Sequence, residues 1–386
     1  MRGGLLAIAV GMLALAGCSP DVEDTRAELP LVAANYIDAG NPETLREWGQ
    51  VQLEGGALIL SDDVQPYDLN TPLFTDYAHK LRTIWMPEGT SAKYTEDEVL
   101  DFPVGTVITK TFYYPIAQGA GEGEVLRDTA SNFFASGKLS LDEVRLIETR
   151  ILVRREAGWE AIPYRWNGEQ TQASLNRIGG IIPLRMSSDD GTAEFNYVMP
   201  NVNECASCHA VNSNEDAIHP IGPKARHLNR DFSYLKTLGG ARNQLEQLTR
   251  VGFLTGAPEG LDAVPKNARW GDKNASLNDR ARAYLDINCS HCHSDVGPAD
   301  TSGLSLEPDA SGAKLGACKL PIAAGAGTGN RRWGIRPGHP EDSILVYRME
   351  SDEADKMMPE IGRTTVHKEG AKLIADWVAA MPGDCT

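Results

Sequence analysis

The chain has 386 residues, which is enough for two or three domains. Its hydrophobic share of 41% and charged share of 23% are ordinary for a globular protein, and they exclude a polytopic membrane protein and a fully disordered chain. The 53 acidic and 37 basic residues give a formal net charge of -16. Such a chain lacks the clustered positive field that nucleic acid binding requires.

Residues 1–17 are predicted to be an export signal. Arg2 precedes an apolar run at 5–15 that is too short to span a bilayer as a stable helix. The run ends in LAGC at 15–18, which resembles the lipobox of bacterial lipoproteins. This resemblance implies lipidation of Cys18 and a periplasmic, membrane-anchored protein, with Ser19 favouring the outer membrane. The alternative is an ordinary signal peptide with an incidental Cys18; either way the mature chain occupies an oxidising compartment.

Residues 18–30 are polar and acidic and are expected to form a tether. Residues 31–200 predict a β-rich, sandwich-like domain, because 106–114, 145–155 and 159–166 are rich in β-branched and aromatic residues. A short helix is expected to begin at Pro42 and to end near Gly49. The polar residues of this domain are expected to be solvated or structural, and they include Asp76, His79, Arg82, Glu148 and Arg150.

Two segments, CASCH at 205–209 and CSHCH at 289–293, have the C-x-x-C-H pattern by which c-type haem is attached. Two thiols add to the two vinyl groups of one haem, and the histidine then binds the iron as proximal ligand. We therefore expect two covalently bound haem c groups, with His209 and His293 as iron ligands. The predicted attachment residues are Cys205, Cys208, His209, Cys289, Cys292 and His293.

Other uses of these cysteines fit the pattern less well. Zinc ribbons usually place their cysteine pairs closer together than Cys208 and Cys289. Neither zinc nor a redox-active dithiol calls for a histidine directly after both pairs. A structural disulfide within either two-residue loop would be strained.

The predicted domain at 276–386 contains the second motif. Ser276 is the expected N-cap of a helix that runs into Cys289, and a second amphipathic helix is expected near 366–378. Two such helices with a methionine loop between them resemble a class I cytochrome c domain. In that family the distal iron ligand is a methionine followed by proline, which implies Met358 here, with Met357 as its local competitor.

Cys318 and Cys385 remain after the lipid site and the two motifs. In an exported protein, two leftover cysteines usually pair. Such a bridge would tie the C-terminal tail to the loop at 319–321 and stabilise the fold by about 3–4 kcal/mol. The alternative is two free thiols.

The first motif belongs to a predicted haem-binding segment at 201–275, in which a short helix is expected at 243–250. No methionine lies between Met199 and Met349, which excludes a distal methionine at the usual downstream distance. The candidate distal ligands are His219, His227, Met199 and Met186. His227 is preferred over His219, because His219 follows the proximal His209 by only ten residues and the loop between them would be tight. Bis-histidine ligation would lower the potential of this haem relative to His/Met ligation; the alternative is water or no sixth ligand.

Four further segments strengthen the comparison with a known family. They are PYDLNTPLF at 66–74, IETR at 147–150, IGPKAR at 221–226 and AAGAGTG at 323–329. Together with the two motifs they resemble a family of exported dihaem c-type cytochromes of Gram-negative bacteria, over residues 50–386. Members tend to be encoded beside an exported parallel β-helix repeat protein, which implies a possible partner.

Two classes of function follow. The first is electron transfer by two haems between a periplasmic donor and an acceptor, with the acidic surface docking a basic partner. The second is a dihaem enzyme, peroxidase-like or a haem-coupled oxidase, in which the first iron keeps an open sixth position. A third possibility is that the β-rich domain binds a carbohydrate or a β-helix partner. No H-E-x-x-H, G-x-S-x-G or Gly-rich phosphate loop is found in the sequence.

Overall fold

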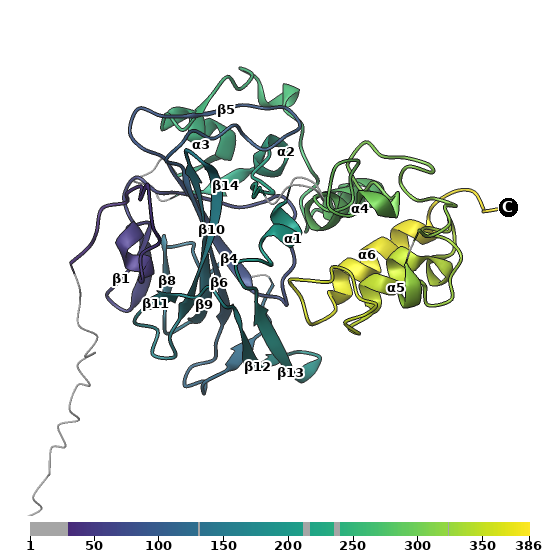
Figure 1. The fold of residues 1–386 in the computed structure, drawn as a ribbon, viewed down its shortest axis with the longest axis horizontal. Helices are drawn as coiled ribbons and strands as arrows, with labels where there is room; N and C mark the ends of the chain where they lie inside the picture. The colour runs from purple at the N-terminus through teal and green to yellow at the C-terminus, as the bar shows by residue number, and fades with distance from the viewer. Residues whose placement is uncertain (1–29, 130–131, 211–216, 235–239, 323) are drawn as a thin grey trace, which may run out of the picture.

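The structure is a computed structural model that describes residues 30–129, 132–210, 217–234, 240–322 and 324–386. The predicted signal, Cys18 and nearly all of the tether lie outside the described residues. Figure 1 shows a β-rich body with a smaller helical part at its side. Within the described part of the chain, none of the helices is both long enough and apolar enough to cross a membrane.

The centre of the β-rich body is a six-stranded antiparallel sheet of order β11-β10-β9-β6-β4-β3. The predicted strands at 106–114, 145–155 and 159–166 are confirmed as β6, β9 and β10. The strand bounds are β3 Gln65–Tyr67, β4 His79–Trp85, β6 Val107–Pro115, β9 Val144–Arg155, β10 Gly158–Trp166 and β11 Ala173–Leu175.

Each face of the central sheet is covered. One face packs against the sheet β1-β2-β8 through a cluster that includes Trp48, Leu58 and Ile151. The sheet β13-β12-β7 joins the opposite face through a second cluster that includes Phe112 and Tyr197. A sandwich-like β-rich body is therefore present. These strands are β1 Val51–Glu54, β2 Ala57–Leu60, β7 Glu124–Leu126, β8 Lys138–Ser140, β12 Gly180–Ser188 and β13 Gly191–Met199.

The helix expected from Pro42 is shorter than predicted. It is a single 3-10 turn, η1 Leu45–Trp48, and Gly49 ends it in a left-handed conformation, as expected. Thr44 and Glu47 form a capping box that fixes the start of the turn after Thr44. The prediction of the start was wrong because the capping pair, and not the proline, sets the first helical residue.

The described residues 217–234 and 240–275 pack on the same face of the central sheet as the second cluster, farther along the strands. Ala225, Leu228 and Leu245 share a hydrophobic cluster with Ile84 and Ile108 of the central sheet. The expected helix at 243–250 is confirmed, with the Asn243 side chain accepting a hydrogen bond from its first turn. The elements are α1 Ala206–His209, α2 Ala225–Leu228, β14 Asp231–Ser233, β15 Ala241–Asn243, α3 Gln244–Arg250, β16 Leu254–Thr255, which pairs with β5 Ala92–Lys93, and η3 Leu261–Ala263.

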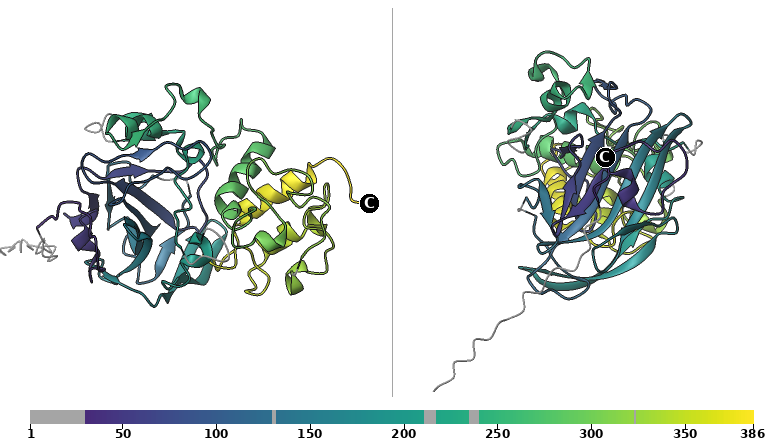
Figure 2. Two further views of the ribbon diagram at one scale, coloured as in Figure 1. Left: turned by 45° about the horizontal axis from the view of Figure 1, so that its top comes forward. Right: turned by 90° about the vertical axis from the view of Figure 1, so that its left-hand side faces the viewer.

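The helical part is built around α4, α5 and α6, which share one hydrophobic cluster (Figure 2). The Ser276 side chain accepts the N-cap hydrogen bond of α4, and α4 continues through a π-turn into Cys289, as the sequence predicts. The bounds are α4 Leu277–Leu285, η4 Asp286–Ser290, η5 Asp300–Ser302, η6 Gly325–Thr328, η7 Pro340–Asp342, α5 Ile344–Glu350 and α6 Lys368–Ala379.

A buried carboxylate joins the two parts. Asp76 is 1% exposed and accepts hydrogen bonds from the backbone N–H groups of Thr364 at 2.8 Å and Thr365 at 2.7 Å. Asp76 and Tyr77 both have positive φ, a strained conformation for residues other than glycine. The turn directs both side chains to the segment before α6, where the hydroxyl of Tyr77 donates to the carbonyl of Val366.

Candidate functional site

The first C-x-x-C-H motif folds into the short helix α1. Cys205 stands at its N-cap and His209 at its last position. The Nδ1 atom of His209 is 2.7 Å from the backbone carbonyl oxygen of His219. Because a carbonyl oxygen can only accept, Nδ1 carries the proton and donates this hydrogen bond. Among the described residues nothing is hydrogen-bonded to Nε2 of His209, so this nitrogen is free to bind a metal.

The second motif has the same arrangement on a different scaffold. Cys289 lies in the π-turn after α4, and Nδ1 of His293 is 3.0 Å from Oγ of Ser302. That hydroxyl donates to the carbonyl of Ala299, so it accepts the proton of His293 Nδ1. A partner at Nδ1 fixes the ring and leaves Nε2 for a metal, which is the usual arrangement of a ligating histidine.

Both histidines are held in the neutral form. Burial, followed by the positive charge of Lys110, lowers the pKa of His209 to about 4. Burial, followed by His291 and Arg348, lowers the pKa of His293 to about 4. Neutral imidazole is the form that binds iron, so each ring is ready for that role at neutral pH.

The two motifs meet in space, between the β-rich body and the helical part (Figure 1). Sγ of Cys292 is 3.8 Å from the carbonyl oxygen of Ser207 in the first motif. A hydrogen bond between the thiols of Cys208 and Cys292 lowers the pKa of Cys208 and raises that of Cys292. Groups attached to these two sulfur atoms would therefore start from neighbouring positions.

The four motif cysteines, Cys205, Cys208, Cys289 and Cys292, are free thiols. In the described chain, none of them belongs to a set of three or more metal-binding side chains whose ligand atoms lie within 4.8 Å of one another. The described arrangement thus gives no support to a tetrahedral zinc site. Two thiols followed by a neutral histidine with free Nε2 are compatible with covalent haem at each motif.

Met358 lies in a loop that a buried arginine organises. Its backbone N–H donates to the carbonyl of Arg348 at 2.9 Å, and its carbonyl accepts from Nε and Nη2 of Arg363. Arg363 is 4% exposed and also donates to the carbonyls of Ser351 and Thr365. Met358 is half-buried and Met357 is buried. Arg363 was not predicted from the sequence, although an arginine shortly after Met-Pro is a local signal for it.

His227 lies in a buried ionic cluster. It is 3% exposed, and its Nε2 is 2.9 Å from Oδ2 of Asp286, the first residue of the π-turn that contains Cys289. Arg226 donates to both carboxylate oxygens of Asp286, at 2.8 and 2.9 Å, and Asn267 donates at 2.7 Å. The cluster joins the first-motif segment to the second motif. His227 as a distal ligand stays a prediction, with Nε2 engaged by Asp286 in this structure.

The other three distal candidates are placed as follows. The carbonyl of His219 lies behind His209, on the side away from a metal at Nε2. Met186 and Met199 are buried in the hydrophobic cluster of the β13-β12-β7 sheet. The sulfur of Met199 is 3.8 Å from Nδ2 of Asn176. These too stay predictions as iron ligands.

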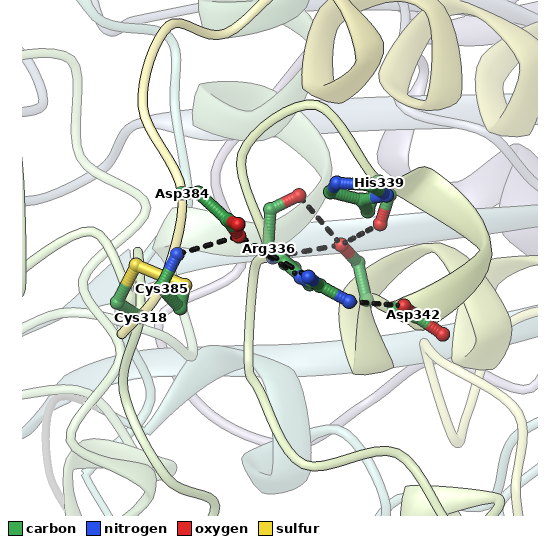
Figure 3. Close-up of a disulfide and its surroundings, with 7 residues drawn as sticks. Cys318, Arg336, His339, Asp342, Asp384 and Cys385 are labelled. Atoms are coloured by element: carbon green, nitrogen blue, oxygen red, sulfur yellow. Dashed lines mark hydrogen bonds and ion pairs between the residues drawn. A yellow bond between two sulfur atoms is a disulfide. The ribbon is translucent and has the colours of Figure 1, made fainter.

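Cys318 and Cys385 form the predicted disulfide, which closes a separation of 67 residues. Figure 3 shows Arg336 beside it, between Asp342 and Asp384. The bridge and this arginine fasten the C-terminal tail to the loops of the helical part. His339, Glu341 and Asp342 bring one imidazole and two carboxylates together nearby, and this group is partly exposed.

Comparisons with known proteins add no relative. No protein-family model matches this chain, and neither a curated protein nor a solved structure is detectably similar to it. The family membership that the motifs imply therefore stays a prediction.

Proposed function

We propose that the mature protein is a periplasmic, lipid-anchored dihaem c-type cytochrome that carries electrons between a donor and an acceptor. The observation that supports this most is the meeting of the two motifs, with Cys292 Sγ 3.8 Å from the carbonyl oxygen of Ser207. Two one-electron centres serve as a relay only if they are close, and neighbouring attachment sulfurs favour closeness. Each bound haem supplies a centre that gains and loses one electron.

The residues of the chain hold and tune these centres. Cys205, Cys208, Cys289 and Cys292 would form the thioether links. His209 and His293 would bind iron through Nε2, and their hydrogen bonds to the carbonyl of His219 and the hydroxyl of Ser302 orient both rings.

The helical part serves as the class I-like cytochrome c region in this proposal. Support comes from α4 leading into Cys289, α6 packed against α4, and the loop of Met358. Arg363 fixes the backbone of that loop, which makes Met358 the proposed distal ligand of the second iron. A thioether ligand raises the potential, so the second haem is the higher-potential centre.

Location and partners are part of the proposal. Cys18 would carry the lipid anchor, with the outer membrane favoured. The net charge of -16 favours a basic redox partner and an association rate that falls with ionic strength. An exported parallel β-helix protein is one candidate for such a partner.

A spectroscopic redox titration of the haem-loaded protein tests the relay. We expect two low-spin, six-coordinate haems with separate potentials. Met358→Ala should lower one potential by on the order of 0.1–0.3 V, within the ~0.8 V span that axial ligands cover, and leave the other unchanged. Met357→Ala is the matched control. An unchanged titration in Met358→Ala rejects this residue as a ligand.

A dihaem enzyme is the second candidate. It is favoured by the contact of His227 Nε2 with Asp286, which occupies one candidate distal ligand of the first iron. The chain between Met199 and Met349 also has no methionine that could take this role. In such an enzyme the first iron would keep an open sixth position. A high-spin component that binds cyanide and turns over peroxide would support the enzyme over the relay.

A further inference from the structure

A row of three positive charges crosses the central sheet. Arg82 of β4, Lys110 of β6 and Arg150 of β9 are directly paired across three neighbouring strands. Like charges at directly opposed positions destabilise a sheet. This row therefore needs a reason beyond folding.

The next row on the same face has a phenylalanine at its centre. Phe112 is paired with Lys80 on one side and with Glu148 on the other. Three cations surround its ring, with Nζ of Lys80 at 5.6 Å, Nζ of Lys110 at 5.4 Å and Cζ of Arg150 at 4.5 Å from the centroid. An aromatic ring attracts cations, but it supplies no negative charge. We call these two rows the cation band.

The cation band interrupts a buried face. The row on its other side is apolar and consists of Ile84, Ile108 and Leu152, in contact with the cluster around α2 and α3. Beyond Phe112 the face continues into the cluster of the β13-β12-β7 sheet. Charged side chains between two hydrophobic clusters are expensive unless they are paired.

The carboxylates of the cation band are already paired with arginines. Glu148 is fully buried and accepts from Arg150 at 2.9 and 2.5 Å and from the hydroxyl of Tyr197 at 2.5 Å. Asp68 lies at the edge of the band and accepts from Arg82 at 3.2 Å and from Arg230. Neither carboxylate is left for the lysines.

The two lysines have no negative partner among the described residues. Nζ of Lys80 donates to the neutral carbonyl of Ala78 at 2.8 Å, and no hydrogen bond or ion pair reaches Nζ of Lys110. Burial, followed by the charges of Arg150 and Arg82, lowers the pKa of Lys110 to about 7. Burial also lowers the pKa of Lys80 well below its usual value, so the band lacks an anion that would keep both amines protonated.

The first C-x-x-C-H motif follows β13, the strand whose Tyr197 hydroxyl donates to Glu148 of the cation band, and Cys205 comes six residues after this strand ends. The charge of Lys110 acts on Cys208 and His209, and the charge of Arg150 acts on Cys205. The side chain of Arg150 is 25% exposed although its carboxylate partner Glu148 is fully buried, so the band retains an accessible side.

We infer that the cation band is a carboxylate-binding site, in which Lys80, Lys110 and Arg150 hold the two propionates of the haem attached at the first motif. The inference deepens the proposed function and rests on it. Haem brings two carboxylates, and these need positive partners when they leave water. A small soluble dicarboxylate has the same chemistry, and the experiment separates the two sources.

The test uses the haem-loaded protein and replaces single lysines. Lys110→Gln and Lys80→Gln remove one charge each, and Lys110→Met repeats the change without an amide. Lys138→Gln is the matched control, because Lys138 is an exposed lysine of the same β-rich body. Two quantities are measured, the midpoint potential of each haem and the heat of binding of malonate, a dicarboxylate probe.

Propionate binding predicts that each band variant lowers one midpoint potential, because a lost positive charge disfavours the added electron. The other haem and Lys138→Gln keep the wild-type values, and malonate does not bind. In protein that also lacks Cys289 and Cys292, the remaining haem should show the shift, which assigns it to the first motif.

Other results overturn the inference in distinct ways. If malonate binds the wild type, Lys110→Gln abolishes binding and both potentials stay unchanged, the site takes a soluble carboxylate and the propionate assignment is wrong. If potentials stay unchanged and malonate does not bind, the band is no anion site. Wild-type protein without covalent haem would instead reject the proposed function, and malonate binding would still test the band.

Discussion

The same five-residue pattern occurs in two different surroundings. The first motif follows β13, whose Tyr197 hydroxyl donates to Glu148 of the central sheet, and its histidine is fixed by the carbonyl of His219. The second motif follows α4 in a helical part that contains the loop of Met358. The pattern sets which cofactor can be attached, whereas the surroundings set charge and ligands. Two unequal redox centres are the expected consequence.

Removal of one motif at a time gives the largest expected effect. Cys205→Ala with Cys208→Ala should leave one haem per chain, and Cys289→Ala with Cys292→Ala should leave the other. Pyridine haemochrome absorbance and intact mass measure the number directly. Each single-haem protein then gives the potential of one centre alone, which sharpens the comparison.

The control for these variants is Cys318→Ser, which removes a cysteine outside both motifs and should keep both haems. If the removal of either pair leaves the haem number at two, covalent attachment at these cysteines is wrong.

Both cysteines of the disulfide lie in the helical part, so we expect the bridge to stabilise that part alone. Replacement of Cys318 and Cys385 by serine should lower the free energy of unfolding by about 4 kcal/mol in the chain-entropy model, since the bridge closes a long loop. Denaturant titration followed by the Soret band of each single-haem protein measures it. We expect the loss at the second motif; an equal loss at the first would mean that the two parts unfold as one unit.

The strands could be predicted from the sequence because β-branched and aromatic residues cluster at 106–114, 145–155 and 159–166. The motif cysteines and histidines could also be found, since their spacing is local. The start of η1 could not, because a side-chain capping pair at Thr44 and Glu47 outweighs the position of Pro42.

The parts of the site that the sequence did not reveal depend on distant pairing. The cation band exists only because strand register aligns Arg82, Lys110 and Arg150. Lys80 and Arg82, two residues apart in a strand, are the one local signal for it. Asp286 was missed for a similar reason, since its partners Arg226 and His227 lie far away in sequence.

Asp286 is the link between the two regions. Burial alone would raise its pKa, but hydrogen bonds from Arg226 and His227 outweigh burial and hold the pKa well below its usual range. Asp286→Asn leaves Arg226 buried without a counter-ion and should destabilise the protein by about 3 kcal/mol. Denaturant titration measures this, with exposed Asp376→Asn as the control.

The pH dependence of this link has a defined sign. A lowered folded-state pKa means that the stabilisation by Asp286 is complete above the unfolded value near 4 and declines at lower pH. The difference in the free energy of unfolding between wild type and Asp286→Asn should therefore become smaller below pH ~4. A constant difference down to pH ~2 would contradict the role of the carboxylate.

His367 gives the smallest expected effect, at the contact between the two parts. Its ring stacks on Phe74 at 4.2 Å between centroids, and the hydroxyl of Tyr284 is 3.0 Å from its Nδ1. Burial, followed by the charges of Lys80, Arg127 and Arg363, lowers its pKa to about 3. The unfolded chain binds this proton near pH 6.5, so wild-type stability falls from pH ~6.5 toward pH ~3.

A glutamine at this position cannot take up a proton. Between pH ~6.5 and pH ~3, the free energy of unfolding of His367→Gln should therefore fall less steeply than that of the wild type, by up to about 1.4 kcal/mol per pH unit. Denaturation midpoints at several pH values measure the slope, with His339→Gln, at a site away from this contact, as the control. Burial also lowers the pKa of His79 and of His227, so these two histidines contribute to the wild-type slope as well. If His367→Gln keeps the full wild-type slope, the acid sensitivity lies with other buried histidines such as His79 and His227, and the contact of His367 with Phe74 and Tyr284 is insensitive to pH.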